Sequence, residues 1–302
     1  MWSRRCKPRW RRSNWPRSKS ARDLGLHMTT TLAHALAQAQ AGGLHRLDAQ
    51  LLLLHACGRG PQERAWLIAH DTDAMPPPQR ALWDSALARR LRGEPLAYIT
   101  GRKAFYGLDL CIDARVLDPR ADTETLVDWA LQALSPSPQR VLDLGTGSGA
   151  VALALQHERS LWAVHAVDYS ADALAVAQAN AQRLKLPVRF SQGDWLQGAQ
   201  GRFHAIVSNP PYVAEGDPHL DALRHEPGMA LSSGSDGLDA IRTIIASART
   251  HLHPGGWLLL EHGFEQAQAV CALLRQAGFS EVQTRHDLAG LERCSGGRFT
   301  PA

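Results

Sequence analysis

The stretch Val141-Leu142-Asp143-Leu144-Gly145-Thr146-Gly147-Ser148-Gly149 decides the fold of this chain. Its apolar first half predicts a short buried strand, and a helix is expected over residues 150–156, directly after the glycines. A strand, a glycine loop and a helix N-terminus in this order let a ligand approach the backbone closely, because glycine has no side chain in the way. The same pattern also occurs in an ordinary tight turn between a strand and a helix, so it needs support from elsewhere in the chain.

A second predicted strand supplies that support. Residues 161–167 are mostly apolar and end at Asp168, 23 residues after Gly145. An acidic residue at the end of this strand is placed to bind ribose hydroxyls. The loop lacks the later glycine of the G-x-G-x-x-G dinucleotide pattern, which favours a ligand without a pyrophosphate, such as S-adenosylmethionine. We therefore expect S-adenosylmethionine to contact the backbone of the loop and the Asp168 carboxylate.

Trp195 follows the third predicted strand, residues 188–191, and lies where an adenine ring would rest. A buried core aromatic is an equally good interpretation of this residue.

The motif Asn209-Pro210-Pro211-Tyr212 follows another apolar run, residues 203–207. The Asn209 amide oxygen accepts hydrogen bonds, and the prolines fix the backbone and leave carbonyl oxygens free to accept them too. Tyr212 adds a flat ring. We interpret these four residues as a catalytic site for a planar NH2 group, because two acceptors can aim its nitrogen at a methyl donor and stabilise the positive charge that develops there.

Alternating strands and helices after residue 140 predict an α/β fold of the Rossmann-like class, with a mostly parallel sheet and ligands at the carboxyl ends of its strands. Asp122 and Thr123 are candidates to cap the helix that precedes this pattern. Residues 31–92 instead show helical periodicity and predict a small bundle of four helices. We therefore expect a basic, disordered leader (1–27), a helical substrate-docking domain (28–94), a hairpin connector (95–120) and a methyltransferase domain (121–302).

Charge separates the leader from the rest of the chain. The net charge is +4, but residues 1–27 hold nine basic residues and one acid, which leaves 24 basic and 28 acidic residues in the remainder. The leader is compatible with an RNA-binding arm, a transit peptide or an upstream extension before a start at Met28, and we favour the last. The mildly acidic body argues against a nucleic-acid groove.

The five cysteines are scattered, without a C-x-x-C pair, and the histidines show no H-E-x-x-H spacing. These patterns predict neither disulfides nor a metal site and favour the reducing cytoplasm. No apolar run is long enough to cross a membrane.

The chain resembles class I S-adenosylmethionine-dependent methyltransferases and, within them, the release factor glutamine methyltransferase family, also called the HemK family. Besides the two motifs above, the resemblance rests on the following stretches: Gly93-Glu94-Pro95-Leu96-Ala97-Tyr98-Ile99, Asp122-Thr123-Glu124, His225-Glu226-Pro227, Ser235-Asp236-Gly237-Leu238-Asp239 and Asp287-Leu288-Ala289-Gly290. It implies N5-methylation of the glutamine in the Gly-Gly-Gln loop of class-1 peptide chain release factors, and a helical N-terminal domain joined by a hairpin to the catalytic domain. We expect the protein to be a monomer.

Carried over to this chain, the resemblance implies that the cofactor contacts residues 145–149, Asp168, Trp195 and Asn209. It implies that the glutamine amide meets residues 209–212, with Phe105 and Pro119 approaching the site from the connector. The family usually reads Ile-Pro-Arg-Pro-Asp-Thr-Glu where this chain has Asp118-Pro119-Arg120-Ala121-Asp122-Thr123-Glu124.

Two alternatives remain from the residues themselves. An adenine-N6 or cytosine-N4 methyltransferase acting on DNA or RNA uses the same chemistry on an exocyclic NH2, but should carry a basic recognition region. A non-catalytic adaptor that binds a translation protein through the helical domain is the other, and the intact motifs argue against it.

Overall fold

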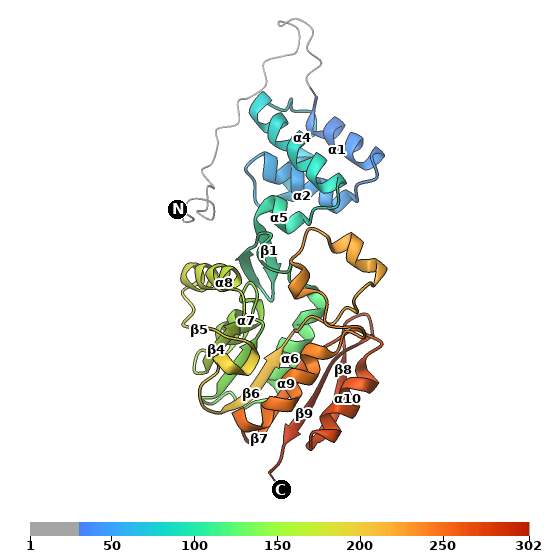
Figure 1. Cartoon of the computed structure of the whole chain (residues 1–302). Helices are drawn as coiled ribbons and strands as arrows, with labels where there is room; N and C mark the ends of the chain where they lie inside the picture. Colours follow the sequence, from blue (N-terminus) through green and yellow to red (C-terminus); the bar gives the residue numbers. More distant parts are fainter. Residues whose placement is uncertain (1–29, 302) are drawn as a thin grey trace, which may run out of the picture. The chain divides into compact units, whose positions relative to one another are not determined.

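The computed structural model describes residues 30–301, and these form two compact units that meet in the chain between Gly101 and Arg102 (Figure 1). The leader, residues 1–27, lies outside the described residues, so the expectation for it stays a prediction. Across residues 30–301, the structure holds no helix with the length and apolar character that crossing a bilayer requires.

The first unit is entirely helical and has its own apolar core. Its helices are α1 (Leu32–Ala41), α2 (Arg46–Ala56), α3 (Arg64–Ala69), α4 (Pro77–Leu91) and α5 (Leu96–Thr100). Leu52, Leu53 and Trp83 are fully buried in this core. The prediction of four helices missed α5, which begins directly after Pro95 and ends at Gly101 in the left-handed region. The helical character predicted for this part of the chain is confirmed.

A hairpin opens the second unit, as expected from the sequence. Strands β1 (Arg102–Phe105) and β2 (Leu108–Cys111) pair in antiparallel register across a two-residue turn. Both turn residues, Tyr106 and Gly107, have positive φ (46° and 73°), as the favoured two-residue hairpin turn requires. The Tyr106 backbone N–H donates to Glu124 Oε1 (2.8 Å), which ties the hairpin to the start of the next helix.

The main sheet of this unit has seven strands in the order β5-β4-β3-β6-β7-β9-β8. Its strands are β3 (Arg140–Leu144), β4 (Ala163–Asp168), β5 (Arg189–Gln192), β6 (Phe203–Ser208), β7 (Leu252–Glu261), β8 (Phe279–His286) and β9 (Glu292–Phe299). The first five strands in this order are parallel, and β9 and β8 pair antiparallel at one edge. The mostly parallel α/β sheet predicted from the sequence is therefore confirmed.

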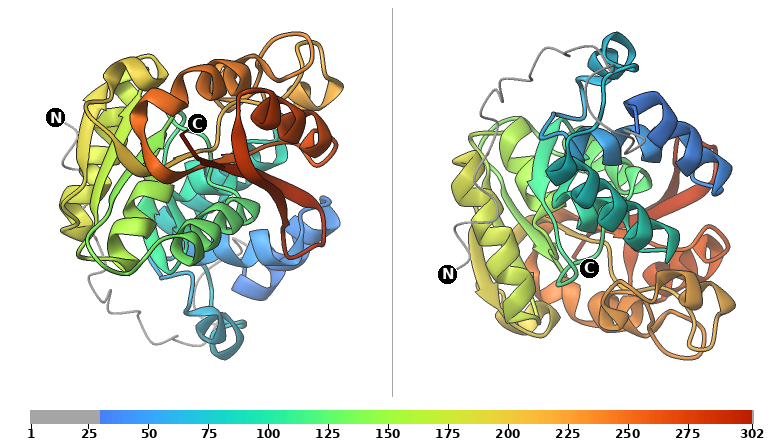
Figure 2. Two further views of the ribbon diagram at one scale, coloured as in Figure 1. Left: turned by 90° about the horizontal axis from the view of Figure 1, so that it is seen from below. Right: turned by 90° about the horizontal axis from the view of Figure 1, so that it is seen from above.

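Helices cover both faces of this sheet (Figure 2). They are α6 (Glu124–Ala133), α7 (Ala150–Glu158) and α8 (Ala171–Leu184) on one face, and α9 (Asp239–Ala248) and α10 (Ala267–Gln276) on the other. Central strands that are covered on both sides must be apolar along their whole length, which explains the runs that precede the two motifs. In β6, for example, residues 205–208 are all buried.

The register of the strands places the loops that follow β3, β4, β6 and β7 at one edge of the sheet. Leu144 pairs with Val167 of β4 and with Ser208 of β6, and Ser208 pairs with Leu260 of β7. The Ser208 hydroxyl also donates to the Leu144 carbonyl (2.8 Å), so β3 and β6 are tied side chain to backbone where both strands end. The glycine loop, Asp168, the N-P-P-Y turn and Glu261 therefore all begin at this edge, where ligands bind in sheets of this type.

Candidate functional site

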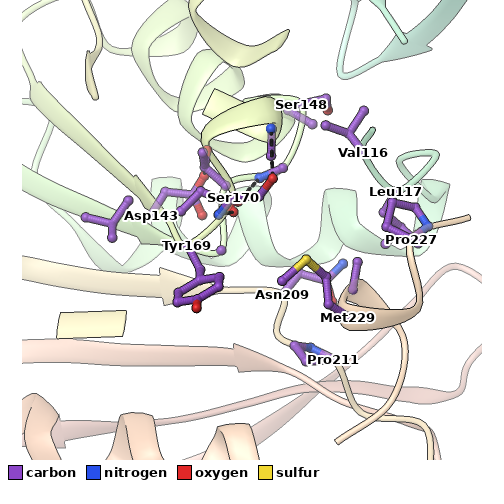
Figure 3. Close-up of a pocket in the computed structure, with 18 of the residues that line it drawn as sticks. Val116, Leu117, Asp143, Ser148, Tyr169, Ser170, Asn209, Pro211, Pro227 and Met229 are labelled. Carbon is purple, nitrogen blue, oxygen red and sulfur yellow. Dashed lines mark hydrogen bonds between the residues drawn. The ribbon is translucent and has the colours of Figure 1, made fainter. Parts of the chain in front are cut away.

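A cavity of about 360 Å³ opens at this edge of the sheet. The glycine loop, the ends of β4 and β6, residues 115–117 and 119, and residues 227, 229 and 230 line it. In Figure 3, Asn209 lies between Tyr169 on one side and Met229 and Pro227 on the other. The two predicted motifs, which are some sixty residues apart in the sequence, therefore share one cavity.

The glycine loop contributes backbone to the cavity. Gly145 and Gly147 have φ of 67° and 55°, which residues with a side chain rarely adopt. Residues 145–148 line the cavity, whereas Gly149 does not. A Cβ on Gly149 would lie 3.0 Å from Leu153 Cδ1 and 3.2 Å from Ala177 Cβ, so this glycine allows α7 and α8 to pack closely. Its expected contact with the cofactor stays a prediction.

Asp143, near the end of β3, holds this loop through hydrogen bonds. Its Oδ2 accepts hydrogen bonds from the Thr146 hydroxyl (2.6 Å) and from the Ala152 backbone N–H (3.2 Å). Burial raises the pKa of Asp143 to about 7, against the lowering effect of these two hydrogen bonds. Asp143 lines the cavity, although the sequence analysis did not single out its side chain.

Asp168 lies at the end of β4 and faces the same cavity. Its Oδ2 accepts from the Gly147 N–H (2.8 Å) and its Oδ1 from the Ser170 N–H (2.9 Å). Burial raises the pKa of Asp168, while these backbone N–H groups act in the opposite direction. Each carboxylate oxygen keeps a further lone pair, so the group can accept from a pair of ligand hydroxyls while it holds the loop.

Aromatic side chains flank the loop on the cavity side. Trp195 is half-buried, lines the cavity and would meet a Cβ on Gly145 at 3.5 Å. Its φ of 49° is unusual for a residue with a side chain. Tyr169, which directly follows Asp168, also lines the cavity and is mostly exposed. The sequence analysis missed Tyr169, although its position after the strand-ending acid was a usable signal.

The N-P-P-Y turn places its residues differently from one another. Asn209 and Pro211 line the cavity, and the Asn209 Nδ2 donates to Thr123 Oγ1 (3.2 Å). No residue in the described part of the chain donates a hydrogen bond to Asn209 Oδ1. Pro210 is buried, and the Tyr212 hydroxyl donates to Glu261 Oε1 (3.3 Å). Neither of these two residues lines the cavity, so their expected contacts with a substrate stay predictions.

The expectation that Asp122 or Thr123 caps α6 is wrong. Neither side chain caps the helix, which instead continues from a short 3-10 turn, Ala121–Thr123. Thr123 is buried beside Asn209, and Asp122 forms an ion pair with Arg293 (3.5 Å). The 3-10 turn already satisfies this helix start, so the Thr123 hydroxyl is available to the site.

Glu261 is a further functional candidate that the sequence analysis missed. It ends β7 and is fully buried, and its Oε2 has no hydrogen-bond partner within the described residues. Burial raises its pKa to about 7, while the Thr123 hydroxyl, Arg293 and Tyr212 act to lower it. An acid directly after the apolar run of residues 257–260 was a usable signal, because that run is a buried strand whose end lies beside Asn209.

Residues 115–120, which we call the lip, border the cavity and include Asp118, one of two departures from the family pattern; the other, Ala121, directly follows the lip. Asp118 is buried, and its carboxylate pairs with Lys103 Nζ (3.0 Å) and more distantly with Arg120 (3.7 Å). The Asp118 backbone N–H donates to Glu226 Oε2 (3.1 Å), and Arg120 pairs with Glu226 Oε1 (2.5 Å). The Glu226 carboxylate therefore holds the lip through one backbone hydrogen bond and one ion pair.

The two connector residues that were expected near the site are placed differently. Pro119 lines the cavity, as the resemblance implied. Phe105 is buried in the hairpin and is not among the cavity-lining residues.

These features fit S-adenosylmethionine. The loop offers exposed backbone, Asp168 offers acceptors for ribose hydroxyls, and Trp195 and Tyr169 offer flat apolar surface for a purine. The glycine backbone at 145 and 147 leaves room that side chains would otherwise take.

Comparison with known proteins agrees with this fit. A family model for the methyltransferase small domain matches residues 122–226, and one for the PrmC N-terminal domain matches residues 28–101. The chain is 51% identical to a release factor glutamine methyltransferase of Bordetella pertussis, over 84% of this chain and 95% of the relative. It is 46% identical to one of Coxiella burnetii, over 82% and 90%.

A methyltransferase structure from Pyrococcus furiosus superposes with a TM-score of 0.51 at 22% identity, over 72% of this chain and all of the other, and this supports the fold alone. With the sequence relatives covering most of its length, the chain belongs to the release factor glutamine methyltransferase family.

Proposed function

We propose that this protein transfers the methyl group of S-adenosylmethionine to the side-chain amide nitrogen of the glutamine in the Gly-Gly-Gln loop of class-1 peptide chain release factors. One observation carries the proposal: the glycine loop with Asp168 and the acceptor Asn209 line the same cavity. The names of the relatives support the release factor as the substrate. The lack of a basic excess in the body of the chain argues against DNA or RNA as the acceptor.

The chemistry requires orientation more than it requires a base. An amide nitrogen is a poor nucleophile because its lone pair is delocalised into the carbonyl. When bound, S-adenosylmethionine supplies a methyl group activated by a sulfonium. Asn209 Oδ1 accepts one N–H of the glutamine amide and the Pro210 carbonyl accepts the other, so the nitrogen is held with a fixed orientation. The same two oxygens stabilise the positive charge that develops on the nitrogen. The sulfur would keep the electron pair of the broken S–CH3 bond and leave as a neutral thioether, and the methylated nitrogen releases one of its two protons to solvent.

The cavity walls serve the two ligands in different ways. Asp168 and the loop backbone hold the nucleoside and the amino-acid end of the cofactor. Pro211 and the apolar side chains at the mouth, among them Met229, exclude water from the flat glutamine amide.

We further propose that the helical domain, residues 28–94, docks the release factor and that residues 95–120 connect it to the catalytic domain. The match of residues 28–101 to the PrmC N-terminal domain model supports this assignment. In this proposal the protein acts in the cytoplasm, because its substrate is a translation factor, and it acts as a monomer.

The test offers labelled S-adenosylmethionine to the full chain with a purified class-1 release factor, and in a parallel reaction with duplex DNA. We expect label in the release factor and none in the DNA. The matched control is the same release factor with the glutamine of its Gly-Gly-Gln loop replaced by alanine, which should stay unlabelled. Label in the DNA, or equal label in the control factor, would refute the proposal.

A further inference from the structure

Three polar side chains form a series that leads from a buried carboxylate to the cavity. Asn209 lies at the cavity end and its Nδ2 donates to Thr123 Oγ1 (3.2 Å). The Thr123 hydroxyl also acts on Glu261, the fully buried residue at the end of β7, and lowers the pKa of its carboxyl group. All three residues belong to the second unit, and they come from the ends of two strands and from the turn before α6.

Counting donors and acceptors gives this series a direction. A hydroxyl has one proton, and because Thr123 Oγ1 accepts from Asn209, that proton is free to go to another acceptor. Glu261 is the acceptor that faces it, and in its ionised form, which predominates above its pKa of about 7, this carboxylate can only accept. Glu261 Oε1 already receives the Tyr212 hydroxyl, whereas Oε2 is buried and receives no hydrogen bond from the described residues, so Oε2 is the oxygen that has capacity for the Thr123 proton.

The direction determines which end of the Asn209 amide faces the cavity. With Nδ2 held by Thr123, Oδ1 is the atom left for a ligand, and nothing in the described residues donates to it. An amide turned by 180° would present NH2 to the substrate NH2, and two donors repel each other. Asparagine has no preference of its own between these two orientations, so its neighbours must impose one.

We infer that Glu261 and Thr123 are positioning residues that orient the Asn209 amide, so that its oxygen rather than its nitrogen meets the substrate NH2. This inference rests on the proposed function for the identity of that NH2 group. Burying a carboxylate at the end of a strand costs free energy. The other ionisable groups that interact with it are Arg293, Asp122, Cys294 and Tyr212. Its retention at the site is explained if the acceptor it provides is needed.

The kinetic test uses the full chain with labelled S-adenosylmethionine and a class-1 release factor. Thr123→Val keeps the shape of the side chain and removes the hydroxyl. We expect kcat to fall about tenfold or more, with the Kd of S-adenosylmethionine changed by less than about threefold. Thr123→Ser restores the hydroxyl, and we expect kcat within about threefold of wild type. Thr284→Val removes a hydroxyl from β8 instead and should leave kcat unchanged.

A double variant tests whether Glu261 affects kcat through Thr123 or independently of it. Glu261→Met removes the acceptor at similar volume and should lower kcat about tenfold. If Glu261 acts through Thr123, the Thr123→Val/Glu261→Met double variant loses little more than either single variant. Multiplied losses in the double variant would overturn the inference, as would a Thr123→Val variant with kcat within about twofold of wild type, or a Thr123→Ser variant as impaired as Thr123→Val.

A second readout does not depend on the methyl acceptor. Urea unfolding is compared for wild type, Thr123→Val, Asn209→Ala and the Thr123→Val/Asn209→Ala double variant. It measures the coupling between the Thr123 and Asn209 side chains without any substrate. We expect the effects on the unfolding constant to depart from multiplication by about threefold or more, and independent effects would overturn the inference. If the wild-type protein labels no release factor, the proposed substrate fails, and this coupling still supports or overturns the orientation of Asn209.

Discussion

Replacing Glu261 by glutamine should make the stability of the protein less dependent on pH. Burial raises the pKa of Glu261 from 4.5 to about 7 in the folded protein. The unfolded chain therefore loses this proton at lower pH than the folded protein, and the folded state loses stability as the pH rises from about 4.5 to about 7. Glutamine has nearly the same shape and no proton to lose, so the variant is spared this loss.

The size of the effect follows from the two pKa values. One unit corresponds to about 1.4 kcal/mol, so a difference of about 2.5 units amounts to roughly 3 kcal/mol once the pH is above both values. Part of this is already lost at pH 5. The free energy of unfolding of Glu261→Gln, minus that of wild type, should therefore increase by about 2–3 kcal/mol between pH 5 and pH 8.

Urea unfolding at pH 5, 6, 7 and 8 measures this difference. Asp143 has a similarly raised pKa and is present in both proteins, so its contribution cancels in the subtraction. Asp143→Asn is the matched control. On its own it should make the free energy of unfolding less dependent on pH, as Glu261→Gln does. When it is present in both proteins, the difference between Glu261→Gln and its parent should be unchanged. A difference between Glu261→Gln and wild type that stays constant with pH, or that decreases as the pH rises, would refute the reasoning. The expected result would mean that the site retains a carboxylate at a cost in stability, a common feature of functional sites.

Three further predictions concern the cavity and its lip. Asn209→Ala should abolish most of the methyl transfer while the Kd of S-adenosylmethionine stays within about threefold, and full activity in a radiolabel assay would contradict the proposed mechanism. Asp168→Asn should weaken S-adenosylmethionine binding about tenfold or more by calorimetry, since it removes a charged acceptor that also holds the glycine loop; unchanged affinity would show that the carboxylate does not bind the cofactor. Lys103→Met should destabilise the protein by about 3 kcal/mol because it leaves Asp118 buried with only the more distant Arg120, whereas Asp118→Ile, which restores the usual family residue, should be neutral or stabilising in urea unfolding. Equal destabilisation by both changes would show that the lip does not depend on this pair.

The elements proposed to bind the cofactor were predictable because each rests on a local rule. A strand followed by glycines with positive φ can be recognised from a few consecutive residues, and so can an acid at the end of the next strand. The register that brings these two loops and Asn209 to one edge then follows from the general arrangement of parallel sheets.

What the sequence concealed depends on contacts between distant segments. Thr123 has the pattern of a helix cap, and only the fold shows that its hydroxyl faces Asn209, 86 residues further along. Gly149 belongs to the loop motif but is needed for helix packing, which depends on where α8 lies. Asp118 is a departure from the family pattern whose partners, Lys103 and Glu226, come from the hairpin and from a segment 108 residues away.

The hydroxyl of Ser208 joins the ends of β3 and β6, one residue before the glycine loop and one before Asn209. The half of the cavity proposed for the methyl donor and the half proposed for the acceptor are therefore parts of one rigid body, and their separation is set when the chain folds. Because these two halves are already fixed relative to each other, ligand binding orders them little further. This lowers the entropic cost of bringing the reacting atoms together. Adjustment to the shape of a particular release factor must then come from segments outside the sheet, and selection among substrates can change there without altering the distance over which the methyl group travels.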